Sequence, residues 1–277
     1  MAHYIKFPKD ITWTLGLSVD SVNGSLTGNY DRTQINPKFG ILWQLSKDTT
    51  LRFASFRTLS RGLGVDATIE PTNLAGFNQY FDSWPVTDAW RYGIGIDHKF
   101  NKSLLVGAEA SKRDLVQPLI DIPSLSILTN KLEEQLLRGY LYWSLNNYFA
   151  ASLEYQYDAF SQSGVSNYKN HIIPFSLRFF DQDYGFNASA TLTYVNQNAL
   201  DPTTGYEVDS GFGLLDFAIG YRIPNRYGII KMQLKNALDK KFNFVGQRVE
   251  GQRNDRFEET PLFIPDRTIF VNFTLSF

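Results

Sequence analysis

The residues best suited to enzymatic chemistry are few, because the sequence has three histidines and no cysteine. Asp97 and His98 are adjacent, which suits a general base oriented by a carboxylate. Side chains next to each other in a strand point to opposite faces, however, so this pair is poorly placed to act on one substrate. His3 and His171 have no second histidine at metal-ligand spacing. Without cysteine there is also no thiolate ligand or thiol nucleophile. We therefore expect no enzyme activity, no metal and no cofactor.

Charged residues that alternate with apolar ones are the other candidates for chemistry. An Arg or Lys in the middle of the lipid face of a membrane strand costs roughly 2–4 kcal/mol, so charges this numerous are expected to face a polar interior. Both signs occur. The side chains either pair across the interior and close it, or stay unpaired and line a wet passage. The candidate lumen-lining residues are Asp20, Arg91, Asp97, Lys99, Glu109, Arg113, Arg138, Glu154, Asp158, Arg178, Asp216, Arg222, Lys231 and Lys235.

Strands must position these residues, because alternation of apolar and polar residues is the dominant pattern of the chain. In the last segment, Ile269, Val271, Phe273, Leu275 and Phe277 share one face. The pattern recurs in segments of about ten residues, the length with which a tilted strand crosses a bilayer. The predicted strands cover residues 11–22, 38–46, 51–60, 89–100, 104–114, 135–145, 148–159, 171–180, 184–195, 212–223, 227–236 and 267–277.

The connections between these segments alternate between short and long. The short ones are residues 47–49, 101–102, 146–147, 181–183 and 224–226, and the long ones are 23–37, 61–88, 115–134, 160–170, 196–211 and 237–266. Outer-membrane barrels have short periplasmic turns and long extracellular loops, whereas a soluble sandwich has no reason to keep this parity.

We therefore predict an all-β fold: a transmembrane antiparallel up-and-down β-barrel of about 12 strands, with short periplasmic turns and long extracellular loops. The whole chain, 1–277, is expected to form this single domain, closed by pairing of residues 11–22 with 267–277. Both ends of the barrel sequence then lie on the periplasmic side.

The composition agrees with this prediction and excludes other classes. A net charge of −1 lacks the strong positive field that nucleic-acid binding needs. No apolar run approaches the roughly 18 residues of a membrane helix. Aromatic residues make up 15% of the chain and fall near strand ends, where interfacial girdles are expected. The girdle candidates are Trp13, Trp43, Tyr92, Phe100, Trp143, Tyr155, Tyr157, Tyr221 and Phe277.

The last third of the chain resembles the end of a TonB-dependent receptor barrel. Residues 215–222 lead into Asn236-Ala237-Leu238-Asp239-Lys240-Lys241-Phe242, which is similar to the family's Asn-Leu-Phe-Asp-Lys-x-Tyr stretch that closes a strand. Residues 265–267, Pro-Asp-Arg, resemble the start of its final strand, and residues 36–43 and 50–57 resemble another strand pair. The resemblance touches most of the chain and implies an outer-membrane receptor or transport barrel.

The C-terminus also resembles the signal that the outer-membrane assembly machinery reads. Phe273, Leu275 and Phe277 supply its alternating apolar residues and terminal Phe, while Asn272 stands where Gly is common. A lipid-facing girdle position for Phe277 is compatible with that role. The resemblance therefore implies recognition of this strand by the assembly machinery.

Two departures from the receptor family bear on function. The plug domain and the energy-coupling box are absent, and a full receptor has about 22 strands. Residues 68–79 and 90–93 also resemble barrels fused behind periplasmic tetratricopeptide repeats, which lack plugs. Both origins stay open. Residues 4–8 look like the tail of a preceding strand, so we expect a C-terminal portion whose leader and partner domain lie upstream, with residues 1–3 foreign to the natural protein.

These patterns predict a protein of the bacterial outer membrane that contacts lipid and lipopolysaccharide, binds no nucleic acid and is a monomer. Its expected function is transport or export of a solute or envelope polymer by a barrel without a plug domain. The alternative is a structural membrane anchor or assembly module with a filled lumen. A periplasmic partner domain is a further expectation.

Overall fold

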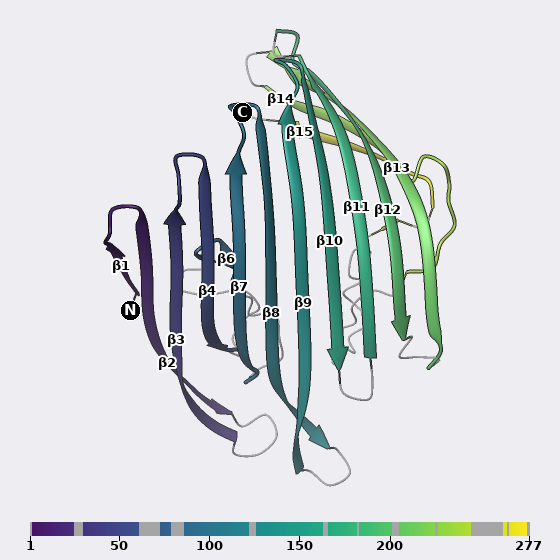
Figure 1. Cartoon of the computed structure of the whole chain (residues 1–277). Coiled ribbons are helices and arrows are strands. Elements are labelled where there is room, and N and C mark those ends of the chain that lie inside the picture. Colours follow the sequence, from purple (N-terminus) through teal and green to yellow (C-terminus); the bar gives the residue numbers. More distant parts are fainter. Residues whose placement is uncertain are drawn as a thin grey trace. The chain divides into compact units, whose positions relative to one another are not determined.

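The computed structural model describes residues 2–24, 30–60, 73–78, 86–121, 126–162, 166–181, 183–200, 205–224, 227–244, 263–264 and 266–275. Thirteen of its strands form one antiparallel sheet in the order β1-β2-β3-β4-β7-β8-β9-β10-β11-β12-β13-β14-β15, and β5 pairs with β6 in a separate hairpin. Apart from the β5–β6 hairpin, strands that follow one another in the sheet also follow one another in the chain, so the predicted all-β, up-and-down antiparallel sheet is confirmed (Figure 1). No helix in the described ranges is long and apolar enough to cross a membrane.

The strands have the following bounds: β1 Ala2–Lys6, β2 Ile11–Gly24, β3 Tyr30–Gln44, β4 Thr49–Leu59, β5 Asn73–Leu74, β6 Phe77–Asn78, β7 Asp88–Lys99, β8 Leu104–Asp121, β9 Ser126–Ser144, β10 Phe149–Gln162, β11 Ser166–Phe180, β12 Phe186–Leu200, β13 Glu207–Ile223, β14 Gly228–Lys235 and β15 Thr268–Leu275. Each of the twelve predicted segments overlaps one of these strands. The thirteenth, β1, includes most of the segment from residue 4 to residue 8 that was predicted to be the tail of a strand.

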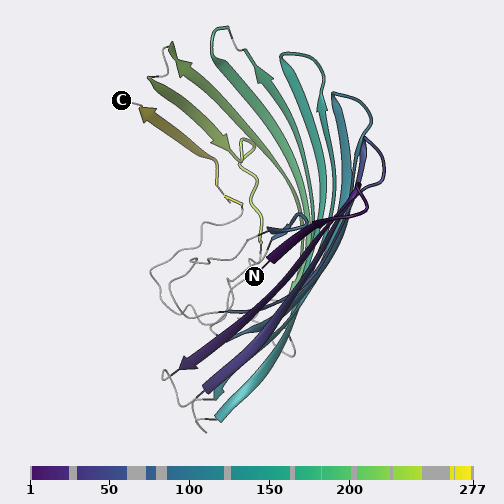
Figure 2. The same ribbon diagram turned by 90° about the vertical axis from the view of Figure 1, so that its left-hand side faces the viewer.

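The chain comprises two compact units. The first consists of residues 1–98, 107–137 and 158–167, and the second of residues 99–106, 138–157 and 168–277. In the first unit β1 to β4 and β7 lie side by side in chain order (Figure 2). In the second unit β11 to β15 do the same.

Each unit has one polar face and one exposed apolar face. In β7 the side of Arg91, Gly93 and Gly95 is buried, while Ile94 and Ile96 on the other side are exposed. In the second unit, Ile219 of β13, Met232 of β14 and Val271 of β15 stand opposite one another. These three apolar residues are all exposed. Alternation along each strand, combined with this register, therefore sorts apolar and polar side chains onto opposite faces.

The strands extend much further than predicted at four of the connections expected to be long. Residues 115–134 were predicted to be a loop, but β8 continues to Asp121 and β9 starts at Ser126. Leu115 and Gln117 keep the alternating burial of β8, whereas the opposite face there carries the polar cluster of Lys112 and Glu133, 2.8 Å apart. Because Lys112, Asp114 and Glu133 interrupt the apolar residues of that face, the sequence pattern ends although both strands continue. Residues 23–37, 160–170 and 196–211 are corrected in the same way.

The predicted pairing of residues 11–22 with 267–277 is wrong. The second edge of β2 is occupied by β1, with Lys6 opposite Thr12 and Ala2 opposite Gly16. The strand order begins at β1 and ends at β15, and no pairing between these two occurs in the described part of the chain. Residues 4–8 had no predicted partner strand, so β2 was expected to take the closing position.

Candidate functional site on the polar face of the sheet

A short hairpin from the predicted long loop lies on the polar face of the first unit. Strands β5 and β6 are joined by Ala75 and Gly76, whose φ angles are 50° and 91°. Two successive positive φ angles are typical of the tight turns that join hairpins, and Gly suits the second position. Asn73 stabilises the turn, because its Oδ1 accepts from the Gly76 N–H at 2.8 Å. The segment of residues 73–78 therefore has a local structure of its own, and we call it the inner hairpin.

The inner hairpin packs on small residues of β3 and β7. Leu74 and Phe77 are 3% exposed. A Cβ at Gly40 would come 3.1 Å from Leu74, and a Cβ at Gly93 would come 2.6 Å from the Phe77 ring. Any side chain at Gly93 would therefore displace Phe77. The absence of a side chain there makes room for the hairpin, which is the close approach that glycine in a strand permits.

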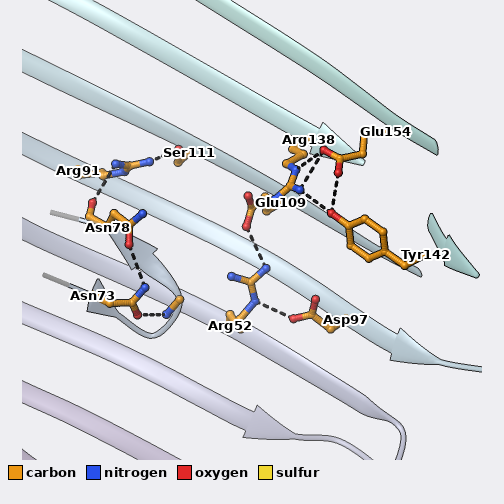
Figure 3. A network of polar contacts seen from close by, with 11 residues as sticks. Arg52, Asn73, Asn78, Arg91, Asp97, Glu109, Ser111, Arg138, Tyr142 and Glu154 are labelled. Carbon is orange, nitrogen blue, oxygen red and sulfur yellow. Dashed lines mark hydrogen bonds and ion pairs between the residues drawn. The ribbon is translucent and has the colours of Figure 1, made fainter. Parts of the chain in front are cut away.

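Arg52 of β4 connects the inner hairpin to two carboxylates. Its Nε donates to Asp97 Oδ2 at 2.8 Å and its Nη2 to Glu109 Oε2 at 3.0 Å (Figure 3). Its guanidinium carbon lies 5.3 Å from the centre of the Phe77 ring, within cation–π range. The predicted site residues Asp97 and Glu109 are thus brought together by an arginine that the sequence analysis missed.

Arg91 holds the other end of the inner hairpin. Its Nη1 donates to the Asn78 carbonyl at 2.9 Å and its Nη2 to Ser111 Oγ at 3.0 Å (Figure 3). Arg91 is 7% exposed, so these contacts replace most of its water. The hairpin is therefore fixed to β7 and β8 by Arg91 as well as to β4 by Arg52.

Other predicted site residues of the first unit also have polar partners. Arg113 forms an ion pair with Glu134 at 3.1 Å. The carboxylate of Asp20 accepts a hydrogen bond from the Asn36 amide, and Asn36 accepts one from Gln34 at 2.6 Å. The polar face of this unit is a network of paired groups.

Two further pairs occur in the second unit. Arg138, Glu154 and Tyr142 form a closed triangle: Arg138 Nε donates to Glu154 at 3.0 Å, Arg138 Nη2 donates to the Tyr142 hydroxyl at 2.6 Å, and that hydroxyl donates to Glu154 at 2.7 Å (Figure 3). Lys235 lies 2.8 Å from Asp216. The second unit thus repeats, on its own polar face, the pairing found in the first.

Four predicted cations are exposed: Lys99, Arg178, Arg222 and Lys231. Their side chains make no hydrogen bond or ion pair with the residues that the structure describes. Asp158 is half-buried on β10. The sequence-based set therefore divides into residues within paired networks and a small exposed cationic group.

An aromatic cluster covers part of the polar face of the second unit. The Phe212 ring stacks on Phe242 with centroids 4.2 Å apart, and Phe244 and Phe263 meet it edge-on. Phe212 also belongs to a buried group with Val195 of β12. Parts of the predicted loops 61–88 and 237–266 therefore lie on the polar faces. Residues 61–72, 79–85, 245–262 and 265 of these loops lie outside the described residues.

The receptor-like motif at residues 236–242 forms a polar turn. Asn236 is 1% exposed with a φ of 48°. Its side chain accepts from the Lys240 N–H at 2.9 Å and donates to the Lys240 carbonyl at 3.0 Å. Asp239 in turn accepts from the Arg267 N–H at 3.0 Å, next to the start of β15. The turn thus fixes where the connection leaves β14 and where the chain re-enters the sheet.

Of the predicted assembly signal, Phe273 and Leu275 lie on the exposed apolar face of β15, and Phe277 lies outside the described residues. No group of three or more His, Asp or Glu side chains that could hold a metal ion occurs in the described ranges. Neither the family models nor the curated proteins include a match to this chain.

Proposed function

We propose that this chain is an outer-membrane β-barrel of transport or receptor type, without a plug domain, whose apolar faces contact lipid and whose polar faces line the lumen. The observation that carries the proposal is the exposed apolar face of each unit. Ile94 is 59% exposed and Phe273 65% exposed. Soluble monomers rarely expose contiguous apolar patches larger than a few hundred Å², so a face of this kind needs a cover. Lipid provides that cover.

The height of the apolar face supports a bilayer as the cover. In the first unit the apolar face ends at Trp90, whose ring centre lies 5.7 Å from the guanidinium carbon of Arg57. From Trp90 to His98, β7 advances eight residues at about 3.3 Å each, which gives about 26 Å before tilt is considered. Barrels of the outer membrane carry an apolar band about 25 Å tall, flanked by aromatic girdles. The polar strand extensions beyond the band then stand outside the bilayer.

The inner hairpin favours a narrow passage over an open pore. It occupies the polar face of β3, β4 and β7, and Arg52 and Arg91 hold it there. The resemblance to TonB-dependent receptors and repeat-fused barrels is part of this proposal, because both imply passage of a solute or polymer. The structural anchor remains the second candidate, and the hairpin also favours it, since a filled lumen is what an anchor needs.

Reconstitution into lipid separates these possibilities. We expect the protein refolded into vesicles to resist proteolysis across its strands and to migrate differently on gels before and after heating. In planar bilayers we expect small conductance steps. A protein that stays soluble without detergent would contradict the membrane proposal. A membrane-inserted protein without conductance would favour the anchor. Large steps like those of a general porin would contradict the narrow passage.

A further inference from the structure

Three cationic side chains on strands β11, β13 and β14 of the second unit differ from the paired residues of its polar face. Arg178 of β11, Arg222 of β13 and Lys231 of β14 are exposed, and their side chains have no hydrogen bond or ion pair with any described residue. Arg138, by contrast, is bound to a carboxylate and a hydroxyl. These three residues, which we call the cationic patch, thus present charges that no described residue neutralises.

The register places the three residues on one face. Arg178 stands opposite Ser189, Ser189 opposite Ala218, and Ala218 opposite Gln233, which is two residues from Lys231. Three strand spacings of about 4.8 Å each put Arg178 and Lys231 about 14 Å apart across the sheet. The distance between their charged ends depends on how the two long side chains extend.

Arg222 and Lys231 are closer to each other. Arg222 stands opposite Ile229, so Lys231 is its diagonal neighbour on the adjacent strand. Diagonal neighbours lie about 7–8 Å apart, within reach of long side chains, and like charges placed this way repel. The sheet therefore keeps the two cations close enough for a single anion to contact both.

The neighbours of the cationic patch supply further donors. A Cβ at Gly220 would lie 2.7 Å from Asn187 Oδ1, so the Asn187 amide lies over this glycine. Asn187 on β12 and Gly220 on β13 belong to the two strands between β11, which carries Arg178, and β14, which carries Lys231. Asn272 stands opposite Lys231. The carboxylate on this face of β13, Asp216, is already bound to Lys235 and to the Asn236 N–H, each at 2.8 Å.

We propose that the cationic patch binds a linear polyanion, whose negative groups bridge Arg178, Arg222 and Lys231. The inference rests on the proposed function in taking the polar face as the wall of the passage, and it names the substrate class: an anionic chain with repeated charged groups. Cations spread over about 14 Å suit such a chain better than a single anion, because one small anion cannot contact all three.

The test is binding of inorganic tripolyphosphate to the full chain refolded in detergent, measured by isothermal titration calorimetry. The triple variant Arg178→Gln/Arg222→Gln/Lys231→Gln should bind at least about tenfold more weakly, because three charge-assisted contacts are lost. The control is Lys9→Gln/Lys47→Gln/Lys102→Gln, which removes the same charge from exposed positions in the short connections. It should change binding less than about twofold, and added salt should weaken wild-type binding.

Three outcomes would overturn the proposal: no binding by the wild type, an equal loss in both triple variants, or orthophosphate binding as tightly as tripolyphosphate. If the triple variant does not refold, Lys231→Gln alone should still weaken binding about threefold, and an unchanged affinity would count against the site. Binding in detergent requires no pore. A protein that binds tripolyphosphate but does not conduct would therefore contradict transport and leave the cationic patch standing.

Discussion

The guanidinium carbon of Arg52 lies 5.3 Å from the centre of the Phe77 ring, and the same side chain donates to Asp97 and Glu109. Arg52 therefore couples the inner hairpin to the charge network of β7 and β8. The Arg52 guanidinium, which is bound to two carboxylates, contacts the Phe77 ring. Gly93 also leaves room for this ring, because a side chain at Gly93 would collide with it. Removing Arg52 should consequently affect both the network and the hairpin.

Arg52→Gln should lower the free energy of unfolding by about 2 kcal/mol, because Asp97 and Glu109 lose their shared cation. Urea titration of the protein in detergent measures this. Arg52→Lys keeps the charge but cannot donate in the same forked geometry, so it should recover only part of the loss. A Gln variant as stable as the wild type would show that the network contributes nothing to stability.

A side chain at Gly93 should displace the inner hairpin without changing any charge. Gly93→Val should raise the single-channel conductance, because the Phe77 position is no longer available. Gly139→Val is the matched control: a Cβ there meets nothing within 4 Å. Planar-bilayer recording compares the two. An unchanged conductance in Gly93→Val, with the control also unchanged, would mean that the hairpin does not restrict the passage.

The sequence predicted the strands well because their apolar faces alternate strictly, as in β7 and β15. The prediction of the strand ends failed where the exposed face is no longer uniformly apolar. Lys112, Asp114 and Glu133 interrupt the apolar residues of the exposed face, so the periodic signal stops although β8 continues to Asp121. Strand ends outside the apolar band therefore could not be found from hydrophobic periodicity.

Arg52 and the inner hairpin escaped prediction for a related reason. The polar face of β4 includes Ala54 and Phe56, which are buried near the hairpin. Apolar residues therefore occur on both faces of this strand, and alternation does not mark Arg52 as a residue of the polar face. The hairpin itself spans only residues 73–78, too short for a periodic pattern. Only its Ala75-Gly76 turn could have signalled it. Pairing partners such as Glu134 for Arg113 depend on register, which alternation alone does not give.

Asn236→Ala should destabilise the end of β14. The substitution removes both side-chain contacts with Lys240 and places Ala at a φ of 48°, a left-handed conformation that Asn tolerates better than Ala. We expect a loss of about 2–3 kcal/mol in urea titration. Asn236→Asp keeps the acceptor for the Lys240 N–H and should lose less. Equal stability of all three proteins would show that the turn is not held by this residue.

Asp239 should make the same region sensitive to acid. The hydrogen bond from the Arg267 N–H, and then the charge of Lys241, hold the pKa of the Asp239 carboxyl below its usual range. A lowered pKa means that the folded state favours the ionised form. The stabilisation is therefore present above the unfolded pKa of about 3.9 and is lost as the pH falls through the folded value. Asp239→Asn should differ from the wild type at pH 6, and this difference should shrink below about pH 4. A difference that does not change with pH would contradict the effect.

Phe175 and Arg178 of β11 test which face meets lipid. Phe175 is 45% exposed on the apolar face, while Arg178 belongs to the polar face three residues further along the strand. Phe175→Arg places a charge where lipid is proposed, at a cost of roughly 2–4 kcal/mol near the bilayer midplane. We expect it to slow and reduce insertion into vesicles, measured by protease protection and heat-dependent gel mobility. Arg178→Gln, on the opposite face, should insert as the wild type does. Equal insertion of the two variants would contradict the lipid assignment of this face. If both faces met a polar environment, the two substitutions would have similar consequences.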